Sequence, residues 1–443
     1  MLKPGTSRLP KEPVIGDVRR FLAELIRQLP ADPADGRTGQ RGRPRILPAL
    51  LLWSGLLVCV LEGFSSQSAI WRLLAVEGLW DNPRLAISDQ AVYKRLAQAG
   101  PSSLHWLFES LTSLLAERLA PWQAKDLAPF ASAVVAIDAT TLDPVARRLT
   151  DKADRQAAKA WLPGKLLGVF DLRRQQWRQL LRRDDAEENE KLAARQLLDA
   201  LPVGALILAD LGFFGFRWFD DLTDAGYWWI SRLRAKTSLQ VIHTFYQDGE
   251  TLDQLVWLGA YRADQAKHAV RRVQFRQGKL LHSYLTNVLD PQQLSLQDIA
   301  LLYARRWDIE MAVQLVKQHL GLRLWWSSNL AVVEQQLWAT LIIAQVLMAL
   351  RLEIAGRAAV DVFDVSLPLL VRYLPRYAAR GQDPVAAFIQ AGRFAGFIRP
   401  SRRVTLTAPL VEPTQLLPLP PEIVLQRLPR YAQRNCGRSV ASN

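Results

Sequence analysis

The segment YARRWDIEMAVQLVK, residues 303–317, has the pattern of a helix with two polar faces. At about 100° per residue, four polar side chains of this segment share about 60° of arc. These four are Tyr303, Arg306, Glu310 and Lys317. Apolar residues border this face on both flanks, and a charge that is buried without a partner is costly. The face therefore needs a polar site that the rest of the chain must supply.

Three further polar residues fall on the opposite side of the same helix: Arg305, Asp308 and His319. One of the two polar faces can simply meet water, whereas the other must meet something else. The helical spacing excludes Asp308 from any site to which Glu310 contributes, because the two side chains point in different directions.

The middle of the chain predicts an α/β fold with a mixed sheet. Buried strands are expected at residues 131–138, 165–173, 175–183, 203–210 and 227–234, and helices at 191–201 and 213–226. The resulting order is β-β-β-α-β-α-β, which is the strand order of an RNase H-like core, with the first and fourth strands adjacent. Alternating segments at 239–246 and 268–288 predict a β-rich insertion.

The chain divides into five predicted regions along the sequence. They are a helical N-terminal DNA-binding region (1–130), the first part of the core (131–234), the β-rich insertion (235–294), the second part of the core with the helix described above (295–356), and a helical, basic C-terminal region (357–443). A long helix is expected at residues 329–356. A Pro-rich segment after residue 403 is expected either to wrap around the surface or to fray.

The net charge of +14 indicates a polyanionic partner, and nucleic acid is the favoured one. The charge is uneven, because residues 131–225 are close to neutral whereas residues 301–443 carry more than half of the excess. In the N-terminal region, TGQRGRPR (38–45) is either a basic arm along phosphates or a solvated linker, next to a short amphipathic helix near 14–29. Residues 66–100 resemble a helix-turn-helix in which Ser88 caps the second helix.

Two uncharged apolar runs, residues 46–61 and 337–350, are shorter than the ~20 residues that span a bilayer. Both predict buried core helices, so a membrane protein is the least favoured interpretation. The N-terminus, MLKPGTSRLPKEP, has no signal-peptide pattern, and we expect a cytoplasmic protein.

Asp138 and Asp210 are the best candidates for a metal-binding pair, because each closes a buried apolar strand. Two ionised carboxylates that lie close together repel one another, and a divalent cation removes that repulsion. Glu310 is the third candidate, since it lies on the polar face that needs a partner. The two cysteines and five histidines have no metal-ligand spacing, so oxygen ligands and Mg²⁺ or Mn²⁺ are expected. Two such ions could promote in-line attack on a phosphodiester.

The spacing Tyr303-x2-Arg306-x3-Glu310-x6-Lys317 resembles the YREK signature of DDE transposases of the insertion sequence 4 family. ADLGFF (209–214) and IDATTL (137–142) are similar to that family's second and first aspartate motifs. The chain departs from the family pattern at Val313, where an aromatic residue is common, and at Leu211, which follows the second aspartate. The resemblance covers residues 131–356.

The resemblance implies that Asp138, Asp210 and Glu310 are the catalytic metal ligands, with two Mg²⁺ or Mn²⁺ ions. It implies that three other residues contact double-stranded DNA at terminal inverted repeats and in the target: Tyr303, Arg306 and Lys317. It further implies strand cleavage and joining, a homodimer on DNA, and a bacterial, nucleoid-associated location. A family hairpin route would need a stacking aromatic residue in the insertion, for which Trp257 is a candidate, although a core tryptophan is the more common case there.

Two alternatives remain open. Another RNase H-like metal-dependent nuclease would share the acids but would not need the YREK spacing. A catalytically silent DNA-binding protein derived from a transposase would not need the acids at all.

Overall fold

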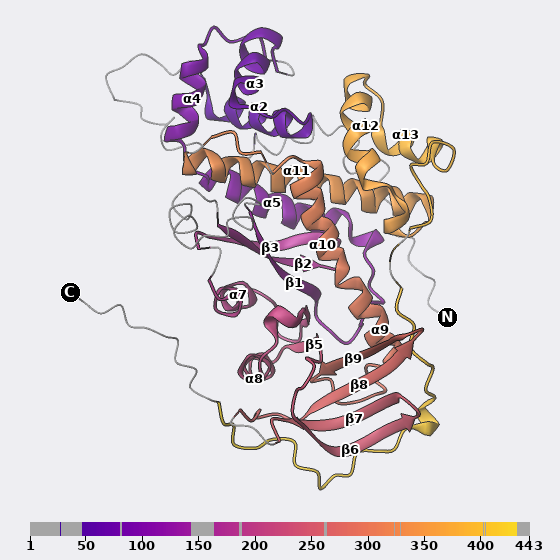
Figure 1. Ribbon diagram of the computed structural model, residues 1–443. Helices are drawn as coiled ribbons and strands as arrows, with labels where there is room; N and C mark the ends of the chain where they lie inside the picture. The colour runs from indigo at the N-terminus through magenta and orange to yellow at the C-terminus, as the bar shows by residue number, and fades with distance from the viewer. Residues whose placement is uncertain are drawn as a thin grey trace, which may run out of the picture.

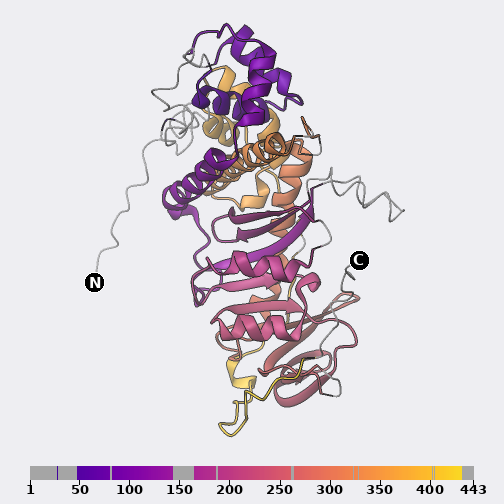
Figure 2. The same ribbon diagram turned by 90° about the vertical axis from the view of Figure 1, so that its left-hand side faces the viewer.

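The computed structural model describes Arg27 and residues 47–431, except residues 80–81, 143–163, 186–187, 261–263, 323, 328, 402 and 404. The predicted basic arm at 38–45 and, apart from Arg27, the helix near 14–29 lie outside these described residues. The molecule is elongated, with helices of the N- and C-terminal regions at one end and strands of the insertion at the other (Figure 1). The side view in Figure 2 shows the same long axis, with the core between the two ends.

A nine-stranded mixed sheet runs through the protein in the order β3-β2-β1-β4-β5-β9-β8-β7-β6. Its core strands are β1 (Val134–Thr141), β2 (Lys165–Asp171), β3 (Gln176–Arg183), β4 (Leu206–Ala209) and β5 (Trp228–Arg232). β1 pairs in parallel with β4 and antiparallel with β2, and β4 pairs in parallel with β5. The predicted adjacency of the first and fourth strands is thus present.

The core sheet is covered by helices on both faces, because its strands are apolar on both sides. Val135 and Ile137 of β1 belong to a buried cluster with α7 (Glu190–Leu198) and α8 (Phe216–Asp224). Val134 and Ala136, which alternate with them, belong to a second cluster with α5 (Ser102–Arg118) and α11 (Leu330–Ala358). Successive side chains of a strand point to opposite faces, and this alternation accounts for the three layers.

The insertion extends the core sheet instead of forming a sheet of its own. It contains β6 (Leu239–Asp248), β7 (Thr251–Leu258), β8 (Val270–Gln277) and β9 (Leu280–Thr286). β9 pairs antiparallel with β5, with Ile230 opposite Thr286. The alternating pattern predicted strands in this region, but it does not indicate this long-range pairing.

The N-terminal region is helical, as predicted, with α2 (Ala49–Leu61), α3 (Gln67–Arg72), the π-helical η1 (Leu73–Glu77), α4 (Asp89–Gln98), α5 and the 3₁₀ turn η2 (Ala120–Trp122). Ser88 accepts a hydrogen bond from the Ala91 N–H at 3.3 Å and so caps α4, as expected. However, residues 78–88 separate η1 from α4, and a helix-turn-helix has a turn of about three to four residues. The compact motif is therefore absent from the described part of this region.

The helix predicted at 303–317 is divided into three segments. α9 (Leu296–Arg305) ends at a turn on Arg306, α10 (Trp307–Gln314) follows, and the π-helical η5 (Leu315–His319) continues it. No proline or glycine lies at either junction. The divisions therefore have a cause other than an intrinsic helix breaker.

α11 is long and apolar enough to cross a membrane, but 94% of its apolar window is buried inside the protein. The helix that contains the apolar run 337–350 is thus longer than that run, and its burial, not its length, identifies it as a core helix. The described C-terminal elements are η6 (Val362–Asp364), α12 (Leu367–Ala379), α13 (Pro384–Ala391) and η7 (Pro413–Gln415).

The Pro-rich segment that follows lies along the insertion, so of the two expected outcomes the structure shows the wrapped one. The Leu417 N–H donates to the Phe245 carbonyl at 2.8 Å, and the Ala269 N–H donates to the Leu425 carbonyl at 2.9 Å. Arg430 forms a β-bridge with Gln265.

Candidate functional site

Asp138 and Asp210 lie next to each other at the point where the parallel pairing of β1 with β4 ends. Ile137 of β1 is the register partner of Ala209 of β4, and each aspartate follows its partner residue directly. The sequence suggested that Asp138 is the last residue of this strand. That is wrong, because β1 continues to Thr141 through its pairing with β2. Pairing with β4 stops at Ile137, so the aspartates occupy the point at which the two strands part.

Glu310 approaches the two aspartates from α10, which packs against β1. Burial raises the pKa of Asp138 to about 6, the Ala139 N–H and Arg306 lower it, and the charges of Glu310 and Asp210 raise it further. The Ala139 N–H donates to Asp138 Oδ1 at 2.9 Å. The carboxylates are thus close enough to repel one another, which is the arrangement that a divalent cation relieves.

The three side chains do not form a closed metal site as they lie. Among the residues that the structure describes, no group of three His, Cys, Asp or Glu side chains is arranged to hold a metal ion. Arg306 Nη2 donates to Glu310 Oε1 at 2.8 Å, so Glu310 is engaged by its own helix neighbour. The donor chemistry nevertheless fits Mg²⁺ or Mn²⁺, because all three side chains are carboxylates, and these ions prefer oxygen ligands.

Tyr303 and Arg306 are turned inward. The Tyr303 hydroxyl donates to the Ala209 carbonyl at 3.5 Å, and its ring lies 4.6 Å from that of Tyr284. Burial raises the pKa of Tyr303 well above its usual range. Arg306 is buried, with its guanidinium 5.7 Å from the centre of the Tyr303 ring, and no described partner accepts from its Nε. The polar face of the helix therefore meets the ends of β1 and β4.

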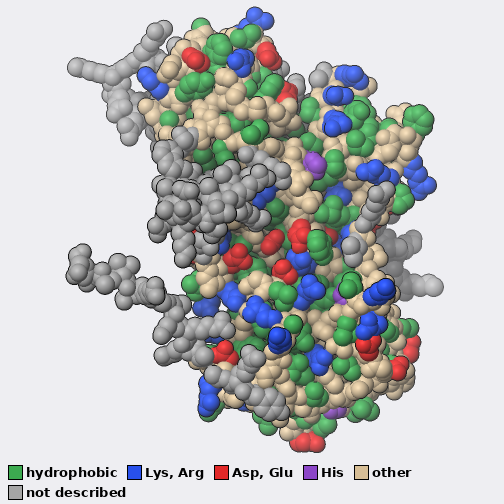
Figure 3. Space-filling model, viewed as in Figure 1, with side chains coloured by type: hydrophobic (Ala, Val, Ile, Leu, Met, Phe, Trp, Pro, Cys, Tyr) green, Lys and Arg blue, Asp and Glu red, His purple; other side chains and the backbone are tan. Residues whose placement is uncertain are grey.

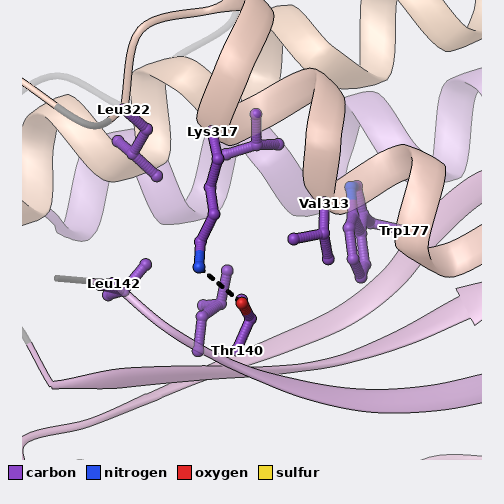
Figure 4. Close-up of a pocket in the computed structure, with 8 residues that line it drawn as sticks. Thr140, Leu142, Trp177, Val313, Lys317 and Leu322 are labelled. Atoms are coloured by element: carbon purple, nitrogen blue, oxygen red, sulfur yellow. Dashed lines mark hydrogen bonds between the residues drawn. The ribbon is translucent and has the colours of Figure 1, made fainter. Parts of the chain in front are cut away.

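Lys317 also faces β1, although it lies in the π-helical segment, where the spacing of 100° per residue no longer applies. Its ammonium donates to Thr140 Oγ1 at 2.6 Å (Figure 4). It also donates to the Thr141 carbonyl. Beneath it lies a small pocket whose walls include Leu142, Trp177 and Val313. Thr140 is a residue of the first aspartate motif that sequence reasoning did not assign, and its place two residues after Asp138 was the available signal.

The opposite polar face of the helix is buried at its centre, because Asp308 is buried and Arg305 is half-buried, whereas His319 is exposed. Asp308 is 1% exposed, and its Oδ2 accepts from Arg305 Nε at 2.8 Å and from Gln175 Nε2 at 2.9 Å. Asp308 thus lies apart from the strand-end aspartates, in agreement with its exclusion on helical spacing. Burial raises the pKa of Asp308, and Arg305 and then Arg403 lower it.

Two tryptophans differ in their surroundings. Trp257 is buried with Phe245 and Leu255, and the Arg427 guanidinium lies 4.5 Å from the centre of its ring. That packing is typical of a core tryptophan. Trp307 is 51% exposed at the start of α10, next to Arg306, and sequence reasoning did not select it.

One face of the molecule carries both signs of charge. On the face shown in Figure 3, acidic side chains gather near the middle of the molecule, and Lys and Arg side chains lie directly below them. Arg234, just beyond β5, donates to the Leu211 carbonyl at 3.2 Å and lies over the Phe214 ring at 4.9 Å. A cation is thereby placed beside the loop that carries Asp210.

Comparison with known proteins gives three similarities. Residues 129–346, just under half of the chain, match the family model described as the transposase DDE domain. The chain is 26% identical over 165 residues to a Sinorhizobium fredii protein named "Putative transposase y4zB", and this match spans 36% of the chain and 45% of that relative. A cryo-EM structure of the piggyBac transposase synaptic complex with hairpin DNA has a TM-score of 0.39 at 9% identity, covering 89% of this chain and 84% of that one.

Proposed function

We propose that this chain is a DDE transposase that cuts and joins DNA at the terminal inverted repeats of an insertion sequence. The observation that carries the proposal is the parallel pairing of β1 with β4, which sets Asp138 beside Asp210 and opposite Glu310. This arrangement lies within residues 129–346, the segment that matches the transposase DDE domain. Assignment to the insertion sequence 4 family rests on the YREK spacing.

Asp138, Asp210 and Glu310 would hold two Mg²⁺ or Mn²⁺ ions, which activate the attacking oxygen and stabilise the leaving oxygen of a phosphodiester when they are bound. The chain's own contribution is to hold these carboxylates on a rigid strand pair and a packed helix. Arg306 would exchange its bond to Glu310 for a DNA phosphate, and this exchange would leave the Glu310 carboxylate free to act as a ligand.

DNA contacts are proposed for Tyr303, Arg306 and Lys317. Arg306 can bind a phosphate through two parallel hydrogen bonds, and Lys317 supplies a compact charge beside β1. Trp307, half exposed next to Arg306, presents a flat apolar surface on which a base can stack. The partners would be double-stranded terminal-repeat and target DNA, with two chains assembling on DNA, in the cytoplasm and nucleoid of a bacterium.

The test is cleavage of a labelled duplex that carries the inverted repeat bordering this gene, in the presence of Mg²⁺. The wild-type protein should nick the repeat end, and Asp138→Ala, Asp210→Ala and Glu310→Ala should each abolish the nick. Glu422→Ala, which removes an exposed acid from the C-terminal segment, is the matched control and should cleave normally.

Cleavage that survives Glu310→Ala would refute the assignment of the third acid. Wild-type protein that binds the repeat but never cuts it would favour a catalytically silent DNA-binding protein, for which the Arg306–Glu310 bond is the supporting observation. Equal cutting of unrelated duplexes would favour another RNase H-like nuclease.

A further inference from the structure

The outer face of α12 carries a row of arginines that the candidate site does not use. Leu370 and Leu374 of this helix are fully buried against the core. Arg372 and Arg376 lie on the opposite side, and Arg380 follows the last residue of the helix. All three are exposed and are spaced four residues apart, so they form one stripe. None of the three forms an ion pair with an acidic residue in the described part of the chain.

A turn beside this helix presents an aromatic ring to solvent. Phe394 is 100% exposed and follows Arg393, which is also exposed. The turn is held on both sides, because the Phe397 N–H donates to the Gly392 carbonyl at 2.9 Å and the Ala395 N–H donates to the Ala391 carbonyl at 3.0 Å. Phe394 is therefore exposed on a hydrogen-bonded turn, directly beside the exposed Arg393.

The stripe lies close to the candidate site. α12 packs against η5, the segment that carries Lys317. Lys and Arg side chains gather over α12 and beside α13 on the face on which the acidic side chains are seen (Figure 3). α12 therefore adjoins the segment that carries Lys317, one of the proposed DNA contacts.

We propose that the arginine stripe of α12 and the turn carrying Phe394 bind the backbone of duplex DNA outside the reacting end. This inference rests on the proposed function, because it extends the DNA path from that site. Arg372 and Arg380 are eight residues apart, about 12 Å along a helix, a length that covers roughly three phosphates of one strand. Phe394 would contact sugars and base edges in the minor groove, where apolar side chains are accommodated.

The proposal is tested by the salt dependence of DNA binding without divalent metal, so that no cleavage occurs. The probe is a fluorescein-labelled duplex of about 40 base pairs that carries the terminal repeat and its flanking DNA, followed by anisotropy between about 50 and 200 mM KCl. The variant is the triple change R372Q/R376Q/R380Q. The control is K125Q/K279Q/R430Q, which removes the same charge from three exposed positions elsewhere.

In the triple variant, the slope of log affinity against log salt should fall by about two to three, with a loss of affinity of about tenfold or more near 100 mM KCl. The triple lysine variant R372K/R376K/R380K should keep the wild-type slope, which separates charge from folding. Phe394→Ser should weaken binding severalfold without changing the slope, because the ring neutralises no phosphate.

A triple variant with the slope and affinity of the control would overturn the proposal. The arginine stripe would then be assigned to binding an acidic protein partner. The outcome is separable from that of the cleavage test. Normal Mg²⁺-dependent cleavage with an unchanged slope refutes only the stripe, whereas a changed slope in a protein that never cleaves refutes only the proposed reaction.

Discussion

Asp138→Asn should stabilise the metal-free protein by an amount that grows with pH. Burial, with smaller opposing effects of the Ala139 N–H and Arg306, raises the pKa of Asp138 from 3.8 to about 6. When the folded-state pKa of a carboxyl exceeds its unfolded value, ionisation costs stability. The contribution of Asp138 to the free energy of unfolding is therefore most favourable below about pH 4, and it is lost as pH rises through about 6.

The size of the effect follows from the same shift. At ~1.4 kcal/mol per pKa unit, ionised Asp138 costs at most about 3 kcal/mol above pH 7, and about 1 kcal/mol near pH 4.5. Asparagine carries no charge, and its side-chain oxygen can still accept from the Ala139 N–H. The advantage of Asp138→Asn should therefore increase by about 2 kcal/mol across this range.

Urea unfolding followed by tryptophan fluorescence, in EDTA at about pH 4.5, 6 and 7.5, measures the difference. Asp126→Asn, which neutralises an exposed acid, is the control and should show little pH-dependent gain. Adding Mg²⁺ at pH 7.5 should stabilise the wild type more than Asp138→Asn, because a cation offsets the buried charge that only the wild type carries. A stability difference that does not change with pH would refute the reasoning, since it would mean that Asp138 is neither buried nor repelled by its neighbours.

Glu310→Gln should weaken Mg²⁺ or Mn²⁺ binding about tenfold or more in calorimetry without DNA, and an unchanged affinity would remove Glu310 from the ligands. Asp253→Ala should cost about 3–5 kcal/mol of stability in urea, because it leaves the Arg271 guanidinium without its carboxylate where both side chains are fully buried; a wild-type midpoint would contradict this. Trp257→Ala should cost about 3 kcal/mol as a core truncation. Trp307→Ala should instead leave the urea midpoint near wild type and weaken DNA binding in anisotropy, and the reverse pattern would exchange the two assignments.

Short apolar runs were enough to predict the five core strands and their order along the chain. Each core strand is a short apolar run, and a run that is apolar on both faces needs helices on both sides. The pairing of β5 with β9 could not be predicted in this way, because it joins residues more than 50 positions apart. Local pattern does not encode which edge a later hairpin will choose.

The N-terminal region shows a different limit. Ser88 is a cap by its chemistry, and the structure contains the hydrogen bond that this chemistry predicts. The separation between the two helices depends on the connection between them, in which the Leu85 N–H donates to the Leu74 carbonyl of η1 and the Trp71 indole N–H donates to the Ile87 carbonyl. The predicted helix-turn-helix, inferred from a capping residue and an interruption between two helical segments, therefore identified the start of α4. It did not identify how α3 and α4 are arranged.

Helical spacing identified which residues of α9 and α10 share a face, but it could not show what either face would contact. The face with Glu310 meets the strand ends. On the other face, Asp308 accepts from Gln175 and from its own helix neighbour Arg305. The environment of Asp308 also includes Arg403, from the C-terminal basic run, so that arginine is partly structural and not simply a solvated charge.

The contacts on the two faces have a joint consequence for the site. Asp308 and Glu310 are two residues apart on one short helix, so a contact that fixes the rotation of α10 at Asp308 also fixes the direction of Glu310. The break at Arg306 is where α9 and α10 can differ in direction. Arg305, the last residue of α9, bonds to Asp308 on one face of α10, and Arg306 bonds to Glu310 on the other. Asp308→Asn should therefore reduce cleavage beyond any loss of folded protein, and Mg²⁺ affinity should fall with it. If cleavage per folded molecule equals that of the wild type, contacts on the face of α10 that carries Glu310 are enough to hold Glu310 in place.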